Sequence, residues 1–235
     1  WVNKNEQWKP LVQSYLACIS FTDYQVGRLL DALDKSAYKD NTYIVLYTDH
    51  GFHQGEKERF AKRSLWEDGT RTPMIIVGPG IAKGGVCSKP TQLLDVYPSL
   101  LELSGLKADP KLEGNSLVPL LKNPQADWPY IAGCSFGPGN YAIVSERYRY
   151  IHYNDGTEEF YDRSKDPHEW HNIINNPEYD AIIQKHRAQI PQQRHKILGQ
   201  QSTGHKSFEA SEAISRGEAI PPDEEIPKKK RKKKN

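Results

Sequence analysis

The chain has 235 residues, of which 37% are hydrophobic and 26% charged, so one or two compact domains with a buried core fit its length. Seven of its 32 cations fill the run 228–234, which leaves 25 Lys and Arg against 30 Asp and Glu in residues 1–227, a net charge of −5. This mildly acidic body argues against a basic nucleic-acid-binding face, and no stretch approaches the roughly 20 consecutive apolar residues of a membrane span.

The start of the chain and its cysteines bear on whether the sequence is part of a longer protein and on its redox compartment. The chain begins at Trp1 rather than at a methionine, and no basic stretch followed by an apolar block, the pattern of a signal peptide, is visible there. We therefore expect the sequence to begin within a longer protein. Cys18, Cys87 and Cys134 are odd in number and form no Cys-x-x-Cys pair, so they indicate neither a disulfide framework nor a redox compartment.

The first half of the chain has the pattern of an α/β domain. Residues 10–36 predict one amphipathic helix, because apolar side chains recur along them at spacings of three and four. Residues 42–48 and 73–77 are β-rich runs that are apolar on both faces, which is typical of a buried parallel sheet. A further helix is expected from Asp95, which would cap it, to Gly105, which would end it. Two parallel strands do not make an ordinary sheet, so we expect the remaining strands to precede Trp1.

A second region follows the linker at residues 123–128. Short aromatic and β-branched runs at 141–145, 148–153 and 160–161, with an Asp-Gly hairpin signal at 155–156, predict a small antiparallel meander. Residues 178–198 predict a final helix, and the polar sequence beyond it predicts disorder. The expected organisation is therefore 1–125 for the α/β part, 126–198 for the antiparallel part with its helix, and 199–235 for a polar tail with a basic end.

The residues that point to chemistry follow the first apolar strand. An Asp at the carboxyl end of a strand is placed where ligands bind α/β sheets, and Asp49 there could ligate a hard divalent cation with His50 beside it. Lys62, brought back over the same strand end, could neutralise an oxyanion. Taken alone, such an Asp is more often a cap or turn residue, and such a lysine is more often solvated.

Together these residues form a longer pattern that resembles the sulfatase family in order and spacing, over roughly residues 10–175. The matching segments are Asp49-His50-Gly51, Gly55-Glu56, Lys62, Thr70-Arg71-x-Pro73, Val77-x-Pro79-Gly80 and the runs 91–106, 112–121 and 159–172. The resemblance implies the rear part of an alkaline-phosphatase-like α/β sandwich, followed by a small antiparallel meander with a helix. His rather than Asn after the metal-binding Asp makes the iduronate-2-sulfatase-like branch the most similar.

The resemblance also implies roles for particular residues. Asp49 and His50 would be two calcium ligands, and His50 could also lie near the leaving oxygen of the ester. Lys62 would bind the sulfate group and offset charge on its oxygens in the transition state. The substrate would be a sulfated carbohydrate or another sulfate ester, and family members are commonly exported, periplasmic or lysosomal.

The sequence departs from the family at the nucleophile. Sulfatases use a Cys-x-Pro/Ala-x-Arg segment whose Cys becomes formylglycine, and none of the three cysteines here lies in such a segment. The early Asp-Asp metal pair of the family is also absent, and calcium takes six to eight oxygen ligands. We therefore predict that the chain alone has no sulfatase activity and binds calcium weakly at most.

Four further residues of these segments have structural interpretations. Arg71 is expected to anchor its loop or to pair with an acid, and His53 to be a solvated loop histidine. In the later segment, Asp166 is expected to form a turn and Glu169 to be a surface or capping acid.

Two other functions stay open. One is a phosphate or phosphonate ester hydrolase of the same superfamily, which would use a Thr or Ser nucleophile. The other is a non-catalytic chain whose basic tail binds nucleic acid, although residues 228–234 contain no aromatic side chains for stacking on bases. The sequence upstream of Trp1 would separate these alternatives. The oligomeric state is not readable from the sequence.

Overall fold

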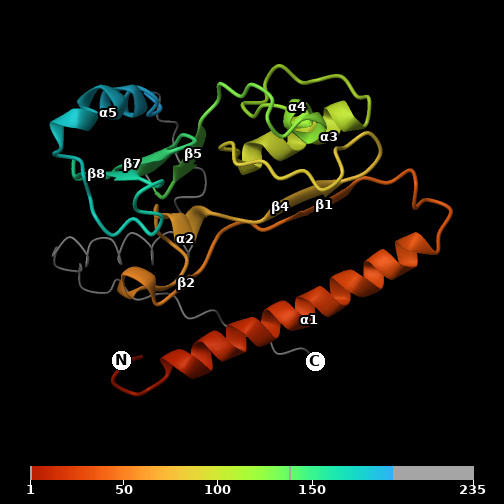
Figure 1. The fold of residues 1–235 in the computed structure, drawn as a ribbon, viewed down its shortest axis with the longest axis horizontal. Helices are drawn as coiled ribbons and strands as arrows, with labels where there is room; N and C mark the ends of the chain where they lie inside the picture. The colour runs from red at the N-terminus through yellow and green to blue at the C-terminus, as the bar shows by residue number, and fades with distance from the viewer. Residues whose placement is uncertain (1, 138, 193–235) are drawn as a thin grey trace, which may run out of the picture. The chain divides into compact units, whose positions relative to one another are not determined.

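The computed structural model describes residues 2–137 and 139–192 (Figure 1). The predicted tail at 199–235 lies outside the described residues, as does the end of the predicted helix after residue 192. The division at residues 125 and 126 stays a prediction. Within the described ranges, no helix combines the length and apolar character that crossing a bilayer requires.

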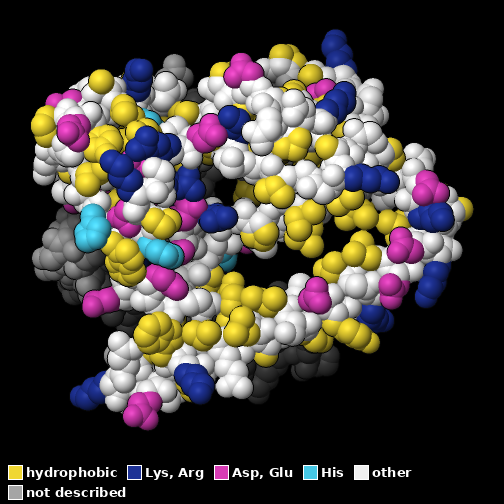
Figure 2. Space-filling view, in the orientation of Figure 1, with side chains coloured by type: hydrophobic (Ala, Val, Ile, Leu, Met, Phe, Trp, Pro, Cys, Tyr) yellow, Lys and Arg dark blue, Asp and Glu magenta, His cyan; other side chains and the backbone are white. Residues whose placement is uncertain are grey.

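The structure confirms the predicted first helix. Helix α1 spans Trp8–Asp34, and it contains no buried residue although its sequence is amphipathic. Tyr15 packs its ring on Phe52 at a centroid distance of 5.0 Å, but Leu11 and Leu29 remain 43% and 71% exposed. Figure 2 shows apolar side chains gathered along this helix. The apolar stripe is therefore present, but only part of it has a packing partner among the described residues.

The first two long strands form an antiparallel pair, so the prediction of parallel strands is wrong. Strand β1 spans Ile44–Tyr47 and strand β4 spans Met74–Val77, with Ile44 opposite Val77. A parallel pair would need a crossover of a dozen or more residues, usually a helix. The connection here instead folds into short hairpin strands and a four-residue helix, and it returns the chain in the opposite direction.

One face of this pair packs against a small helical layer. Met74 and Ile76 contact a buried cluster of Leu117, Leu120 and Trp128, which lies in and beside helix α4 (Val118–Lys122). The alternate residues Ile75 and Val77 are 54% and 50% exposed. The strands are thus apolar on both faces, as the sequence shows, but only one face is covered in the described part of the chain.

The predicted helix after Asp95 is present, but its capping differs from the prediction. A turn of 3₁₀ helix (η2, Leu93–Asp95) leads into α3 (Val96–Leu103), which ends before Gly105 at φ +69°. The Asp95 carboxylate does not cap α3. It accepts the backbone N–H of Gln92 at 2.9 Å and that of Asn115 at 2.8 Å, because it is buried beneath the loop that contains Asn115.

The second region is a four-stranded antiparallel sheet in the order β5-β6-β7-β8, which confirms the meander. Its strands are β5 (Ala132–Ser135), β6 (Tyr141–Val144), β7 (Tyr148–His152) and β8 (Glu158–Asp162). The β7–β8 hairpin turns at Gly156, where φ is +87°. Strand β5 was not predicted, because its sequence Ala-Gly-Cys-Ser has no β-branched or aromatic residue.

Both faces of this sheet are buried. On one face Ile143, Tyr150 and Phe160 pack with Tyr179 and Ile183, which come from η3 (Pro177–Tyr179) and α5 (Asp180–Arg187). On the other face Ala142, Ile151 and Tyr161 pack with Leu65, which lies in the connection between β1 and β4. Helix α5 ends at Arg187, earlier than predicted, because Pro191 cannot continue a helix. The sheet therefore joins the final helix to the connection that contains the candidate site.

A buried histidine on α5 predicts a pH dependence of stability. His186 is 7% exposed, its Nδ1–H donates to the Ile182 carbonyl at 2.8 Å, and Nε2 lies 2.9 Å from Ser145 Oγ. Burial lowers the pKa of His186 below its ordinary value. At acidic pH the histidine therefore binds a proton more readily in the unfolded chain than in the folded one. The free energy of unfolding should fall as the pH drops below about 6.5.

The change should be at most about 1.4 kcal/mol per pH unit for this one group. Urea denaturation at pH 7 and pH 5 would measure it, with His186→Gln expected to show a smaller loss than the original chain. His168→Gln serves as the control because His168 is exposed. Equal losses in the original chain and in His186→Gln would contradict this assignment.

Candidate active site

The site is built by a short hairpin that follows strand β1. Asp49 and His50 come directly after the strand, and β2 (His53–Gln54) then pairs antiparallel with β3 (Phe60–Ala61). The turn between them contains η1 (Glu56–Glu58) and Gly55, whose φ of +124° favours glycine. Because the hairpin reverses the chain, the residue after β3, Lys62, returns to the end of β1.

The structure brings the three predicted site residues together. Lys62 Nζ lies 2.7 Å from His50 Nε2, and Asp49 Oδ1 lies 3.5 Å from the same nitrogen. The His50 Nδ1–H donates to the Gly51 carbonyl at 2.8 Å, so in the neutral ring Nε2 is the acceptor that faces Lys62. The result is a carboxylate, an imidazole and an ammonium group within contact distance at the end of one strand.

Gly51 holds this group close to helix α2 (Glu67–Thr70). Its backbone N–H donates to the Gly69 carbonyl at 3.1 Å, and a Cβ at position 51 would lie 2.1 Å from the Asp68 carbonyl oxygen. A side chain therefore does not fit at this position without a shift of the backbone. The close approach of the two segments explains why a glycine follows the Asp-His pair.

Asp49 and His50 fit part of a divalent cation site. The Asp49 side chain is 83% exposed, and its carboxylate lies near enough to His50 Nε2 for both groups to contact one ion. Calcium takes six to eight oxygen ligands, of which Asp49 can supply at most two, and His50 offers a nitrogen that contacts Lys62 in this structure. The donor set therefore agrees with a contribution to a calcium site but does not complete one.

The three residues line a cleft of about 1520 Å³. Its lining also includes residues 87–94, strand β5 and Val144 of β6, together with Arg147 and Arg163. The Arg147 guanidinium pairs with Asp162 and holds the pKa of that carboxyl far below its usual range. The cleft is thus lined by cations, several of which are already paired with acids.

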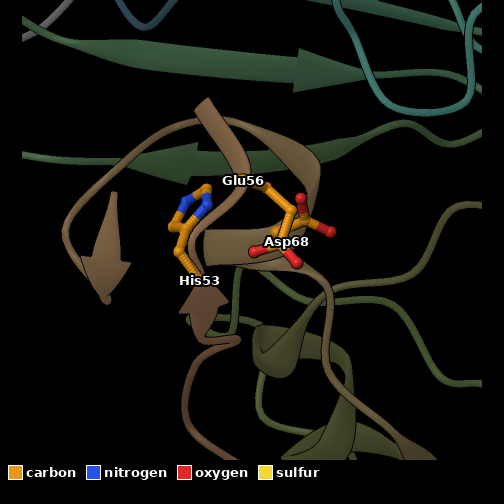
Figure 3. A group of neighbouring side chains, drawn as sticks. All are labelled: His53, Glu56 and Asp68. Atoms are coloured by element: carbon orange, nitrogen blue, oxygen red, sulfur yellow. The ribbon is translucent and has the colours of Figure 1, made fainter. Parts of the chain in front are cut away.

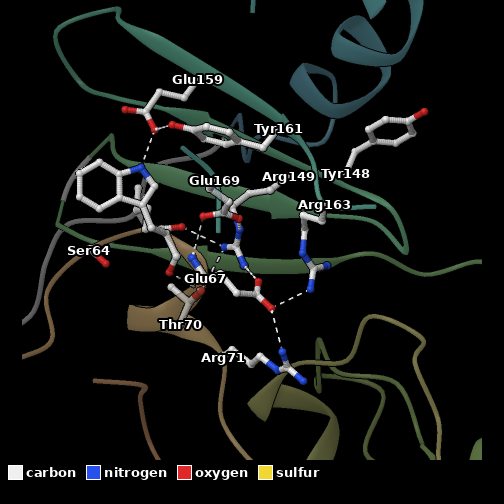
Figure 4. A network of polar contacts seen from close by, with 12 residues as sticks. Ser64, Glu67, Thr70, Arg71, Tyr148, Arg149, Glu159, Tyr161, Arg163 and Glu169 are labelled. Atoms are coloured by element: carbon white, nitrogen blue, oxygen red, sulfur yellow. Dashed lines mark hydrogen bonds and ion pairs between the residues drawn. The ribbon is translucent and has the colours of Figure 1, made fainter. Parts of the chain in front are cut away.

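A buried ion network fixes the segment after Lys62 to the second sheet (Figure 4). Arg149 on β7 is paired with Glu67 of α2 and with Glu169, and its Nε lies 2.6 Å from Glu169 Oε1. The same guanidinium donates to the Leu65 carbonyl at 2.9 Å and to Thr70 Oγ1 at 3.0 Å. One side chain therefore holds both ends of the segment 65–70.

The two carboxylates of the network respond differently to burial. Burial acts to raise the pKa of Glu67, but the charges of Arg149 and Arg163 hold this pKa below its ordinary value. Burial raises the pKa of Glu169, against the pull of Arg149. Glu169 Oε2 accepts the backbone N–H of Glu67, the first residue of α2, at 2.8 Å, as a capping acid would, but Glu169 has no exposed surface, so its prediction as a surface acid is wrong. The reason is that it neutralises Arg149, which the sequence analysis did not single out.

Other predictions for this region have mixed outcomes. Arg71 pairs with Glu67 at 3.8 Å, which confirms that it pairs with an acid, and Asp166 accepts the backbone N–H of His171 in a turn, as expected. His53 is completely buried, so its prediction as a solvated histidine is wrong. Its Nε2 lies 2.6 Å from Ser64 Oγ, and its ring lies edge-on to that of Trp66 at a centroid distance of 6.3 Å.

Burial lowers the pKa of His53. No hydrophobic periodicity could have revealed this residue or Arg149. Strand β2 is only two residues long, and β7 is buried on both faces, so the sequence shows no alternation around either residue.

Two family descriptions match this chain. Residues 2–106 match the family described as Sulfatase, and residues 55–196 match the one described as N-sulphoglucosamine sulphohydrolase, C-terminal. The chain belongs to the sulfatase family. Its α/β fold with a small antiparallel sheet and helix is confirmed by the likeness to solved sulfatase structures.

The chain is similar to three proteins of differing activity. A sulfatase of Formosa agariphila is 45% identical over 191 residues, which are 81% of this chain and 38% of that protein. A protein solved in complex with its substrate D-glucosamine-2-N,6-O-disulfate is 31% identical with a TM-score of 0.68, covering 77% of this chain and 40% of that one. A phosphonate monoester hydrolase of Agrobacterium radiobacter is 25% identical with a TM-score of 0.66, covering 78% and 41%. The chain spans less than half the length of each.

The buried network predicts unequal effects of two arginine substitutions. Arg149→Met would leave Glu67 and Glu169 buried without their main partner, and it should lower the free energy of unfolding by about 3–5 kcal/mol. Arg71→Met removes a 78% exposed arginine that also pairs with Glu67, and it should cost less than about 1 kcal/mol. Denaturant titration of the two variants measures the difference, and equal losses would contradict the network's role.

Proposed function

We propose that this chain supplies the cation-binding and sulfate-binding part of a sulfatase active site that hydrolyses sulfate esters of sugars. The observation that carries the proposal is the approach of Lys62 Nζ to within 2.7 Å of His50 Nε2, with Asp49 beside them at the edge of the cleft. An ammonium group next to a cation-binding pair suits an anionic ester, whose charge both can offset.

Each residue has a stated task in this proposal. Asp49 and His50 would hold a calcium ion, which supplies Lewis-acid stabilisation of the ester oxygens when it is bound. Lys62 binds a sulfate oxygen and offsets the charge that develops on it. Since the Nδ1–H of His50 is directed to Gly51, Nε2 is the atom that would bind the cation, in place of its contact with Lys62, or alternatively would lie near the leaving oxygen. The nucleophile would be a formylglycine, and none of the three cysteines lies in the required Cys-x-Pro/Ala-x-Arg segment.

The substrate class is supported by a relative and by the cleft. A similar protein was solved with D-glucosamine-2-N,6-O-disulfate as its substrate. Arg147, Arg163 and Lys89 of the cleft are each paired with an acid, so Lys62 and the 78% exposed Arg71 are the cations that would favour an anionic sugar. Within sulfated sugars, His50 directly after Asp49 supports a place near the iduronate-2-sulfatase-like branch. By family analogy the protein would act outside the cytoplasm, either exported, periplasmic or lysosomal.

A phosphonate or phosphate ester hydrolase is the second candidate. The likeness to the phosphonate monoester hydrolase of Agrobacterium radiobacter, at 25% identity, supports it. The same cation and ammonium group would suit a phosphonate oxygen. The choice between sulfur and phosphorus esters depends on the nucleophile, for which a cysteine favours sulfate and a Thr or Ser favours phosphate.

A chimera tests the proposed function without assuming what else the protein contains. The matched residues of this chain would replace their counterparts in the Formosa agariphila sulfatase, and the purified chimera would be assayed on a chromogenic sulfate ester and on a phosphonate ester. We expect hydrolysis of the sulfate ester, while the 235-residue chain alone shows none. In the chimera, Lys62→Ala should lower kcat by about 10²- to 10³-fold, the typical cost of losing one oxyanion-stabilising group.

Lys107→Ala is the matched control, because Lys107 is exposed and lies outside the cleft. It should leave kcat unchanged. A folded chimera that cleaves only the phosphonate ester would favour the second candidate. If Lys62→Ala and Lys107→Ala gave the same kcat, Lys62 would have no role in the reaction.

A further inference from the structure

Three side chains with atoms that can ligate a metal lie together at the β2–β3 hairpin and helix α2, separate from Asp49 and His50. His53 of β2, Glu56 at the start of η1 and Asp68 of α2 each place a ligand atom so that all three lie within 4.8 Å of one another. Figure 3 shows the His53 ring beside the two carboxylate groups. The three side chains come from three different elements, so whatever they bind would connect these elements.

The histidine in this cluster has a buried ring nitrogen without a hydrogen-bond partner. The His53 ring has no exposed surface, and Nε2 is occupied by Ser64 Oγ at 2.6 Å. The other ring nitrogen, Nδ1, is buried and has no hydrogen-bond partner. A buried polar atom left without a partner costs about 1–3 kcal/mol, so such atoms need an explanation. A bound cation would supply one.

The two carboxylates are also short of partners. One oxygen of Glu56 accepts the backbone N–H of Gln54, and Asp68 receives no side-chain hydrogen bond from the described residues. The cations of the same hairpin hydrogen-bond to other groups. Lys57 donates to the Glu169 carbonyl and lies over the Trp66 ring, and Arg59 donates to the Arg63 carbonyl. Two neighbouring negative charges therefore lack an ion pair in the described part of the chain.

We propose that His53, Glu56 and Asp68 bind a divalent transition metal of the zinc class. One imidazole nitrogen with two carboxylate oxygens is a donor set that suits such an ion, and three protein ligands leave a position for water. Ser64 would hydrogen-bond to the ring nitrogen of His53 that does not bind the metal. When Nε2–H donates to Ser64 Oγ, the Nδ1 lone pair is left free for the metal, which is the arrangement usual for metal-binding histidines.

The site would act on the hairpin rather than on the ester. The metal would connect β2, η1 and α2 near their turns, and these elements place Lys62 and the segment after it. Because the ion binds the folded chain and not the unfolded one, it should raise the unfolding temperature in proportion to the logarithm of its concentration.

The test is calorimetric titration of the 235-residue chain with Zn²⁺, paired with thermal unfolding at increasing Zn²⁺. We expect one Zn²⁺ per chain whose affinity falls at least tenfold in Asp68→Asn and in His53→Gln. Asp40→Asn, an exposed aspartate, and Asp49→Asn should keep that affinity. Because His53 is buried and its variant may not fold, Asp68→Asn, which is only half-buried and keeps its shape, decides the outcome.

Three results would overturn the proposal. The first is the absence of Zn²⁺ binding and of thermal stabilisation in the original chain. The second is unchanged binding in a folded Asp68→Asn. The third is loss of binding in Asp49→Asn alone, which would place the ion at the Asp49 and His50 pair. None of these results depends on esterase activity, so the proposed function and this site can fail independently.

Discussion

The buried pairing of Arg149 with Glu67 and Glu169 is the interaction on which the arrangement of the site depends. Arg149 belongs to the second sheet, whereas Glu67, Leu65 and Thr70 belong to the connection that returns Lys62 to the end of β1. The site hairpin has few strand pairs of its own, since β2 and β3 are two residues each. Its position is therefore fixed from outside, by charge pairing and by Leu65 packing on the sheet.

This kind of interaction determines geometry more than it adds stability. Burying an arginine and two glutamates costs desolvation energy that the pairing recovers only when the contacts are complete. Here every arm of the guanidinium has a partner, and Glu67 receives Arg163 as well. Trp66 extends the same connection by donating to Glu159 at 2.7 Å. The segment 65–70 is consequently held at several points on one face of the sheet, and Lys62 is placed just ahead of it.

The sequence predicted the site better than it predicted the environment of the site. The Asp-His pair after an apolar strand and the returning lysine depend on local order, and the structure brings all three together. The prediction of parallel strands was wrong because apolar runs indicate burial and not the path of the chain between the strands. The predictions that Glu169 and His53 are exposed were wrong because their partners, Arg149 and Ser64, are distant in sequence or set by strand pairing. The four small residues of β5 were missed because they carry no strand propensity, and their pairing with β6 determines their structure.

Backbone hydrogen exchange of residues 65–71 in Arg149→Met tests this dependence most directly. The Glu67 N–H donates to Glu169, and the amides of Gly69 and Thr70 donate to Trp66 within the held segment. Ile183→Ala, which should lose about 2–5 kcal/mol by opening a cavity against α5, controls for general destabilisation. The account predicts that these amides exchange more than about tenfold faster in Arg149→Met than in Ile183→Ala. Equal protection in the two variants would show that the segment keeps its place without Arg149, and would contradict the account.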